Sequence, residues 1–171
     1  MRYAIGDLHL GHENILKFKN YDGSKLRPWT ELDKMHEDMV QWWNEIVTEK
    51  DTVYLLGDVV IHRRYMNLLG DMNGRKILIR GNHDIFKLKY YLPYFDDIRA
   101  CKVGDGYIMT HIPIHEDSLG RYKLNIHGHL HSNRIKTYLG FDEVDDKRYV
   151  CVSAEQVNYR PKLLEDIIAR K

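Results

Sequence analysis

Five short apolar segments of this chain each lead into polar residues, and this repeated phase constrains the fold more than any other feature. Ligands of α/β proteins bind beyond the carboxyl ends of the strands. Five strand ends in this phase are therefore expected to bring their polar groups into one cleft. The segments and the groups that follow them are residues 3–5 with Asp7, 53–56 with Asp58, 77–79 with Asn82, 107–109 with His111, and 124–126 with the histidines at 127–131.

Helical periodicity alternates with these strands. From Thr30 to Val47 the apolar residues recur at three- and four-residue spacing, which is typical of an amphipathic helix, with Thr30 as its N-cap. We predict a shorter helix between Arg63 and Asp71, and a last helix over residues 160–171 with Pro161 in its first turn. The alternation of strands and helices predicts an α/β fold.

The size and charge of the chain narrow its class. We expect residues 1–171 to form one domain with a substantial core. The net charge of +1 gives no strong field for nucleic acid or a membrane surface. No apolar run reaches the length of a membrane span, and no signal-peptide pattern precedes the first strand. Cys101 and Cys151 form no CxxC pair and are expected to be reduced and buried. We therefore expect a cytoplasmic protein without a membrane partner.

Three histidines stand at alternate positions within five residues, at His127, His129 and His131. A packed core does not require such a run, whereas neutral imidazole is the commonest nitrogen ligand of transition metals. Together with the other strand-end groups they supply two carboxylates, one amide and four imidazoles, which is enough for two ions and more than a closed structural zinc site needs. His127 should face away from this set. The candidate metal ligands are Asp7, His9, Asp58, Asn82, His111, His129 and His131.

The order of these motifs resembles that of the calcineurin-like metallophosphoesterases. Their joint occurrence in this order is far more specific than any single motif. The opening GDLHLGHENI is also similar to that of small phosphoesterases from bacterial and phage genomes. The resemblance implies an α/β fold in which two mixed β-sheets pack as a sandwich with flanking helices, in four layers. The matching segments are Asp7-Leu8-His9, Gly57-Asp58, Gly81-Asn82-His83-Asp84, His111 and Gly128-His129-Leu130-His131.

The resemblance also implies a role for each of these residues. His83 matches the family's catalytic histidine beside the leaving-group oxygen, and Asp84 would orient or tune it. Asn82 would contact the substrate as well as a metal ion. One ion would be held by Asp7, His9, Asp58 and His131, and a second by Asp58, Asn82, His111 and His129, with Asp58 bridging the two.

Three further residues are candidate substrate contacts. His12 follows Gly11 near the first motif, where contact with substrate and simple packing are equally expected. His62 and Arg63 follow the Asp58 loop and could reach a phosphate, although exposed surface is the default for such residues.

Two ions about 3.5–4 Å apart can clamp a phosphoryl group and lower the pKa of a bridging water to about 7. The resulting hydroxide would attack phosphorus in line, and the ions would stabilise charge on the equatorial oxygens. His83 would stabilise that charge or protonate the departing alkoxide. The expected activity is therefore two-metal-dependent hydrolysis of a phosphate ester.

The substrate and the metal are less constrained by the sequence. A chain of this length leaves little room for a cap over the site, so we expect phosphodiesters, with a phosphomonoester of a small metabolite or nucleotide as the alternative. Mixed nitrogen and oxygen ligands suit manganese, which we favour, and also iron, zinc, nickel or cobalt.

Other classes of protein fit the sequence less well. A non-catalytic metal-binding scaffold on the same fold would not require both Asn82 and His83. A metallo-β-lactamase-like hydrolase needs an HxHxDH pattern, which the histidine run does not complete. No helix-turn-helix or zinc-finger signature is present, so nucleic acid is expected only as a substrate. A homodimer is a further expectation from the family resemblance.

Overall fold

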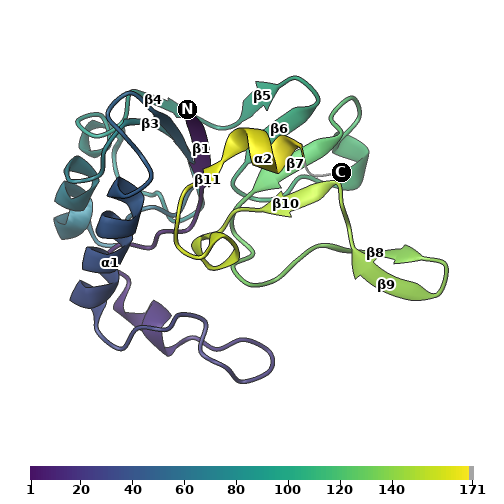
Figure 1. Ribbon diagram of the computed structural model, residues 1–171, viewed down its shortest axis with the longest axis horizontal. Helices are drawn as coiled ribbons and strands as arrows, with labels where there is room; N and C mark the ends of the chain where they lie inside the picture. The colour runs from purple at the N-terminus through teal and green to yellow at the C-terminus, as the bar shows by residue number, and fades with distance from the viewer. Residues whose placement is uncertain (170–171) are drawn as a thin grey trace.

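The computed structural model describes residues 1–169 and contains two mixed sheets (Figure 1). In the first sheet the strand order is β11-β1-β2-β3-β4. Strands β1 to β4 run parallel, and β11 pairs antiparallel with β1. The strands span β1 (Arg2–Ile5), β2 (Thr52–Leu55), β3 (Arg75–Ile79), β4 (Asp97–Arg99) and β11 (Lys162–Leu163).

In the second sheet the strand order is β10-β7-β6-β5. Strands β10, β7 and β6 run parallel, and β5 pairs antiparallel with β6. The amide of Gly6 donates to the Val152 carbonyl at 2.8 Å, just beyond the end of β1, and so joins the two sheets at their carboxyl edges. The strands span β5 (Lys102–Gly104), β6 (Tyr107–Thr110), β7 (Leu124–His127) and β10 (Tyr149–Cys151).

The helices cover the first sheet more fully than the second. Helix α1 (Leu32–Asn44) packs beside the first sheet (Figure 1). The segment predicted as a short helix forms the 3-10 helix η2 (Arg63–Gly70). Further short 3-10 helices are η1 (Glu13–Lys17), η3 (Leu88–Tyr90), η4 (Glu116–Ser118) and η5 (Ala154–Val157). The expected class, two mixed sheets with flanking helices, is confirmed.

The predicted N-terminal ends of the first and last helices are both wrong. The N-cap of α1 is Glu31 in extended conformation, and Thr30 precedes it. Pro161 does not begin a helix, because Lys162 and Leu163 pair with the free edge of β1 before helix α2 (Leu164–Ile168) starts. Residues 170 and 171 of the predicted helix lie outside the described part of the chain.

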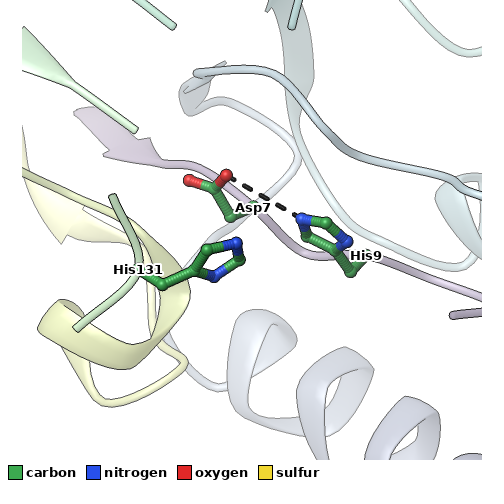
Figure 2. A group of neighbouring side chains, drawn as sticks. All are labelled: Asp7, His9 and His131. Atoms are coloured by element: carbon green, nitrogen blue, oxygen red, sulfur yellow. Dashed lines mark ion pairs between the residues drawn. The ribbon is translucent and has the colours of Figure 1, made fainter. Parts of the chain in front are cut away.

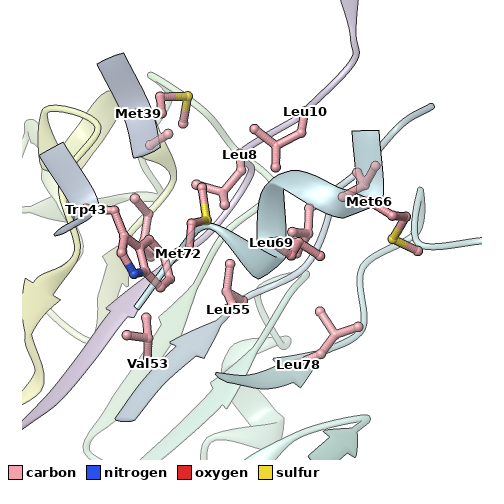
Figure 3. Close-up of a cluster of buried hydrophobic side chains, with 14 of the residues drawn as sticks. Leu8, Leu10, Met39, Trp43, Val53, Leu55, Met66, Leu69, Met72 and Leu78 are labelled. Carbon is pink, nitrogen blue, oxygen red and sulfur yellow. The ribbon is translucent and has the colours of Figure 1, made fainter. Parts of the chain in front are cut away.

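Two apolar clusters hold these layers together. The larger one lies between the first sheet and the α1 and η2 side, where Met39 and Trp43 meet Leu55 and Leu69 (Figure 3). The second fills the space between the sheets, with Leu56 and Ile79 from one side, Met109 and Ile126 from the other, and Leu164 of α2 packed against them. This packing holds the strands in place, and with them the loops that follow their ends.

A two-stranded hairpin, β8 (Lys136–Leu139) with β9 (Asp142–Asp145), projects from the body near β10 (Figure 1). No sequence pattern predicted this hairpin. Both cysteines are free, but neither is fully buried as expected, because Cys101 is exposed and Cys151 is partly exposed. Within residues 1–169, no helix combines the length and the apolar character needed to cross a membrane.

Candidate metal centre

The loops that follow the parallel strands bring the predicted ligands into two groups. Asp7, His9 and His131 form the first (Figure 2), and their ligand atoms lie within 4.8 Å of one another. Asp58, His111 and His129 form the second group with the same spacing. These residues come from the ends of β1, β2, β6 and β7.

The carboxylate of Asp58 lies between the two groups. Its Oδ2 atom is 3.8 Å from His9 Nε2 in the first group and 3.3 Å from His111 Nε2 in the second. Asn82 joins the second group, because its Oδ1 atom is 2.9 Å from His111 Nε2. This is the arrangement in which one carboxylate oxygen can serve two ions.

The first group contains buried polar atoms that a cation would satisfy. Asp7 Oδ1 and His9 Nε2 are buried and have no hydrogen-bond partner in residues 1–169. They lie 3.9 Å apart. Nitrogen and oxygen ligands bind a metal ion at about 2.0–2.2 Å, which places two ligands of one ion roughly 3–4 Å apart. Because buried polar atoms are normally paired, the donor set fits a metal ion at this position.

Acceptor atoms also converge in the second group. A backbone carbonyl can only accept, so His111 Nδ1 donates to the Leu56 carbonyl at 2.7 Å. In a neutral ring the Nε2 lone pair would then face an amide oxygen of Asn82 and a carboxylate oxygen of Asp58. A divalent cation would satisfy all three atoms, so this donor set fits a metal ion as well.

The backbone of the ligand loops is strained. Seven non-glycine residues within residues 1–169 have a positive φ, and five of them are candidate ligands. Such conformations cost of order 1–3 kcal/mol each and persist where the surrounding fold imposes them, often at functional sites. The five ligands are Asp7 (φ 56°), His9 (φ 52°), Asp58 (φ 51°), His129 (φ 69°) and His131 (φ 51°).

Two glycines allow the loops to approach each other. Gly57 has a φ of +79°, and a Cβ there would lie 2.4 Å from His111 Nδ1. A Cβ at Gly128 would lie 2.5 Å from Asp7 Oδ2 and 2.7 Å from the Leu56 carbonyl oxygen. A side chain at either position would therefore separate the loops that carry the ligands.

Hydrogen bonds fix the first ligand aspartate. Asp7 Oδ2 accepts from the His129 amide at 2.8 Å and from Ser153 Oγ at 2.7 Å, so Oδ1 is left for a metal ion. Burial raises the pKa of Asp7 to about 6, and the neighbouring histidines oppose the shift. Burial and the nearby Arg27 lower the pKa of His9 well below its usual value, which keeps the ring neutral and able to ligate.

A buried arginine supports the first group from behind. Arg27 is fully buried and donates to the Asp7 carbonyl at 2.5 Å, to the Leu8 carbonyl at 2.8 Å and to Glu155 Oε1 at 2.8 Å. His131 Nδ1 lies 3.2 Å from the same Glu155 oxygen. Carboxylates that accept from a ligand histidine orient its ring in many metal sites. No spacing pattern links Arg27, Glu155 and Ser153 to the candidate ligands, so none of the three was predicted from the sequence.

His83 and Asp84 occupy different environments. His83 is exposed at the mouth of the site, with its ring centroid 6.0 Å from that of His9, and its amide donates to Asp58 Oδ1 at 2.8 Å. Asp84 is buried, and its carboxylate accepts from the amides of Asp58, Val59 and Gly81 at 2.8–3.1 Å. Asp84 therefore ties the His83 turn to the Asp58 loop through the backbone, and its expected role in orienting or tuning His83 stays a prediction.

The candidate substrate contacts lie in different places. His12 is half-buried, and its Nδ1 atom is 3.0 Å from His9 Nδ1, so it contacts a candidate ligand directly. His62 is exposed and packs edge-on against Tyr65, whereas exposed Arg63 lies over the Tyr90 ring. His127 is buried with Nδ1 2.7 Å from the Gly128 carbonyl, as a structural role requires.

Known proteins with similar sequence and fold place this site in context. A family model described as calcineurin-like phosphoesterase matches residues 3–169. Uncharacterized protein MJ1445 of Methanocaldococcus jannaschii is 31% identical over 170 residues, which cover 97% of this chain and 88% of that protein. Gene 66 protein of Mycobacterium phage L5 is 29% identical over 89 residues, which cover 48% of this chain and 39% of the phage protein.

A solved structure with a similar fold is the crystal structure of AQ665 from Aquifex aeolicus, a protein of unknown function. It superposes with a TM-score of 0.70 at 25% identity, over 98% of this chain and 97% of that one.

Proposed function

The chain belongs to the calcineurin-like phosphoesterase family, and on that premise we propose that it is a two-metal-dependent phosphodiesterase. The family and the two ligand groups support a metal-dependent phosphoesterase. The observation that carries the finer proposal is the position of Asp58 Oδ2, 3.8 Å from His9 Nε2 and 3.3 Å from His111 Nε2.

In this proposal each group of ligands holds one ion, and Asp58 belongs to both. When bound, divalent ions supply Lewis-acid neutralisation of phosphate charge and activate water at neutral pH. Manganese suits the mixture of imidazole, amide and carboxylate donors, as do iron, zinc, nickel and cobalt. The proposed ligands are Asp7, His9, Asp58 and His131 for the first ion, and Asp58, Asn82, His111 and His129 for the second.

Two residues of the chain would carry out the proton transfer to the leaving group: His83 as the donor and Asp84 as the residue that positions it. His83 is exposed on a turn whose amide is bonded to Asp58, so its ring can reach an ester oxygen next to the ligands. As an imidazolium it would donate a proton to the leaving alkoxide. The Asp84 carboxylate accepts three hydrogen bonds from backbone amides, which keep this turn in position, so Asp84 is a positioning residue.

The openness of the site favours diesters. Asn82 and His83 are both exposed, so a substrate with groups on either side of the phosphate meets no wall at these residues. Hydrolysis of a phosphomonoester of a small metabolite or nucleotide is the second candidate, and a non-catalytic scaffold on the same fold is the third. The cytoplasmic location and the homodimer also stay predictions.

Activity and metal content together test the proposal. Bis-p-nitrophenyl phosphate and p-nitrophenyl phosphate are compared with manganese for the wild type, His83→Ala and Asp58→Asn, with the exposed His115→Ala as control. We expect diester cleavage to exceed monoester cleavage, to collapse in the first two variants and to persist in the control. Preference for the monoester would overturn the diester assignment, and inactivity with two ions bound would favour the scaffold.

A further inference from the structure

A groove of about 400 Å³ opens directly beside the candidate ligand His131. Its other wall is the loop that follows η1, with Phe18 and Tyr21 among its lining residues, and Asn133 lies on the side of the histidine run. The loop extends from the body between β1 and α1 (Figure 1). A substrate whose phosphate contacts the first ligand group therefore has this groove next to it.

A row of aromatic rings connects the ligands to the groove. The rings of His9 and His12 are stacked, with centroids 5.2 Å apart and an angle of 24° between their planes. The ring of Phe18 meets His12 edge-on at 5.6 Å. Tyr21 is 98% exposed and Phe18 46% exposed, so neither ring is buried in the core. Exposed apolar side chains that gather at one place mark binding surfaces.

The loop that carries these rings is held in place. Ser132 Oγ donates to Asn20 Oδ1 at 2.6 Å, which ties the loop to the residue next to His131. Asn20 Nδ2 donates in turn to Ser24 Oγ at 2.9 Å, and residues 19 and 25 form an isolated β-bridge. Just beyond the loop, buried Arg27 anchors the chain under the site. The groove is therefore formed before a ligand arrives.

The chemistry of the groove matches a flat ring with a polar edge. Aromatic faces bind nucleobases by stacking, and the side-chain amide of exposed Asn133 can both donate to and accept from a base edge. Lys19 and Lys25 are exposed on the same loop and carry charge complementary to phosphates. An aliphatic phosphate ester would leave the aromatic rings unused.

We propose that this groove binds the nucleobase of the substrate, so that the phosphodiester cleaved next to it belongs to a nucleotide or a nucleic-acid end. This inference rests on the proposed phosphoesterase function for its substrate, but not for the binding of a base. The key residues are Phe18 and Tyr21.

Equilibrium binding tests the groove without any reaction. Calorimetry compares AMP with ribose 5-phosphate, which keeps the sugar and phosphate but lacks the base. Base stacking on an aromatic side chain corresponds to about a 5- to 150-fold gain in affinity. We expect AMP to bind more tightly within that range, and the Phe18→Ala/Tyr21→Ala variant to lose the difference. Equal affinities in the wild type, or a preference that survives in the variant, would overturn the proposal.

A matched variant and a pair of substrates separate the groove from the chemistry. Tyr138 and Phe141 are also exposed aromatic residues, but they lie on the β8–β9 hairpin, so Tyr138→Ala/Phe141→Ala should keep the preference. The p-nitrophenyl ester of TMP and methyl p-nitrophenyl phosphate share a leaving group and differ in the nucleoside. We expect the groove variant to lower kcat/KM for the nucleoside ester at least 5-fold more than for the methyl ester. Equal losses would contradict the groove, whereas inactivity on both esters with AMP still preferred would count against the phosphoesterase function alone.

Discussion

Replacing Arg27 by methionine should destabilise the protein strongly, because the arginine is a fully buried charge whose carboxylate partner is nearly buried as well. Its guanidinium donates to two backbone carbonyls and to Glu155, whose side chain is only 5% exposed. Methionine fills similar space but leaves the Glu155 carboxylate buried and paired only with His131. Breaking a buried ion pair on one side costs about 3–5 kcal/mol. For a chain of this size that corresponds to a fall in Tm of roughly 6–20 °C.

The assay is thermal and urea unfolding of the metal-free protein, so that loss of metal does not enter the result. Arg134→Met is the matched control, because Arg134 pairs with Asp145 on the exposed hairpin and its side chain is 59% exposed. Exposed pairs contribute about 0–1 kcal/mol. The double variant Arg27→Met/Glu155→Gln removes the stranded charge and should be more stable than Arg27→Met alone. A loss below about 1 kcal/mol for Arg27→Met, or no recovery in the double variant, would refute this reasoning.

Three further predictions concern the ligand loops and the ions. Gly128→Ala should lower stability and metal affinity together, because its Cβ would lie 2.5 Å from Asp7 Oδ2; unchanged unfolding and metal titrations would contradict the close approach. Metal occupancy should fall as the pH drops from 8 to 6, because Asp7 and His131 must both be deprotonated to bind a metal ion. Burial raises the pKa of Asp7 to about 6. Burial lowers the pKa of His131, but the hydrogen bond and charge of Glu155 outweigh it and raise that pKa. Equilibrium dialysis with manganese measures the occupancy, and constant occupancy would count against these ligands. Chelation should lower Tm by roughly 11–22 °C if both ions were present at about 100 times their Kd, whereas an unchanged Tm would mean that the folded site binds no ion.

The candidate ligands could be predicted from the sequence because their signal is local, and their role as ligands stays a prediction. Each ligand follows an apolar strand within a few residues, and parallel strands carry their carboxyl ends to one edge. The same segments predicted an α/β fold, and the family resemblance alone implied the two mixed sheets. Asp84 shows the limit of this reasoning, since a motif gives its position but not the direction of its carboxylate.

The support of the site was not accessible, because it depends on contacts between distant parts of the chain. Arg27 and Glu155 are 128 residues apart, and neither stands in a motif. The β8–β9 hairpin has mostly exposed strands without the alternation of apolar and polar residues that indicates a half-buried strand. Pro161 looked like the first turn of a helix, but the unpaired edge of β1 supplies backbone partners that local sequence does not reveal.

Manganese binding to the metal-free protein, followed by elemental analysis and electron paramagnetic resonance, tests the two-metal claim most directly. Because Asp58 Oδ2 lies between the two ligand groups, we predict two ions per chain at saturation and the signal of an exchange-coupled pair, with the coupling lost in Asp58→Asn. One ion per chain, or two ions with independent signals in the wild type, would contradict the bridging role of Asp58 and the mechanism built on it.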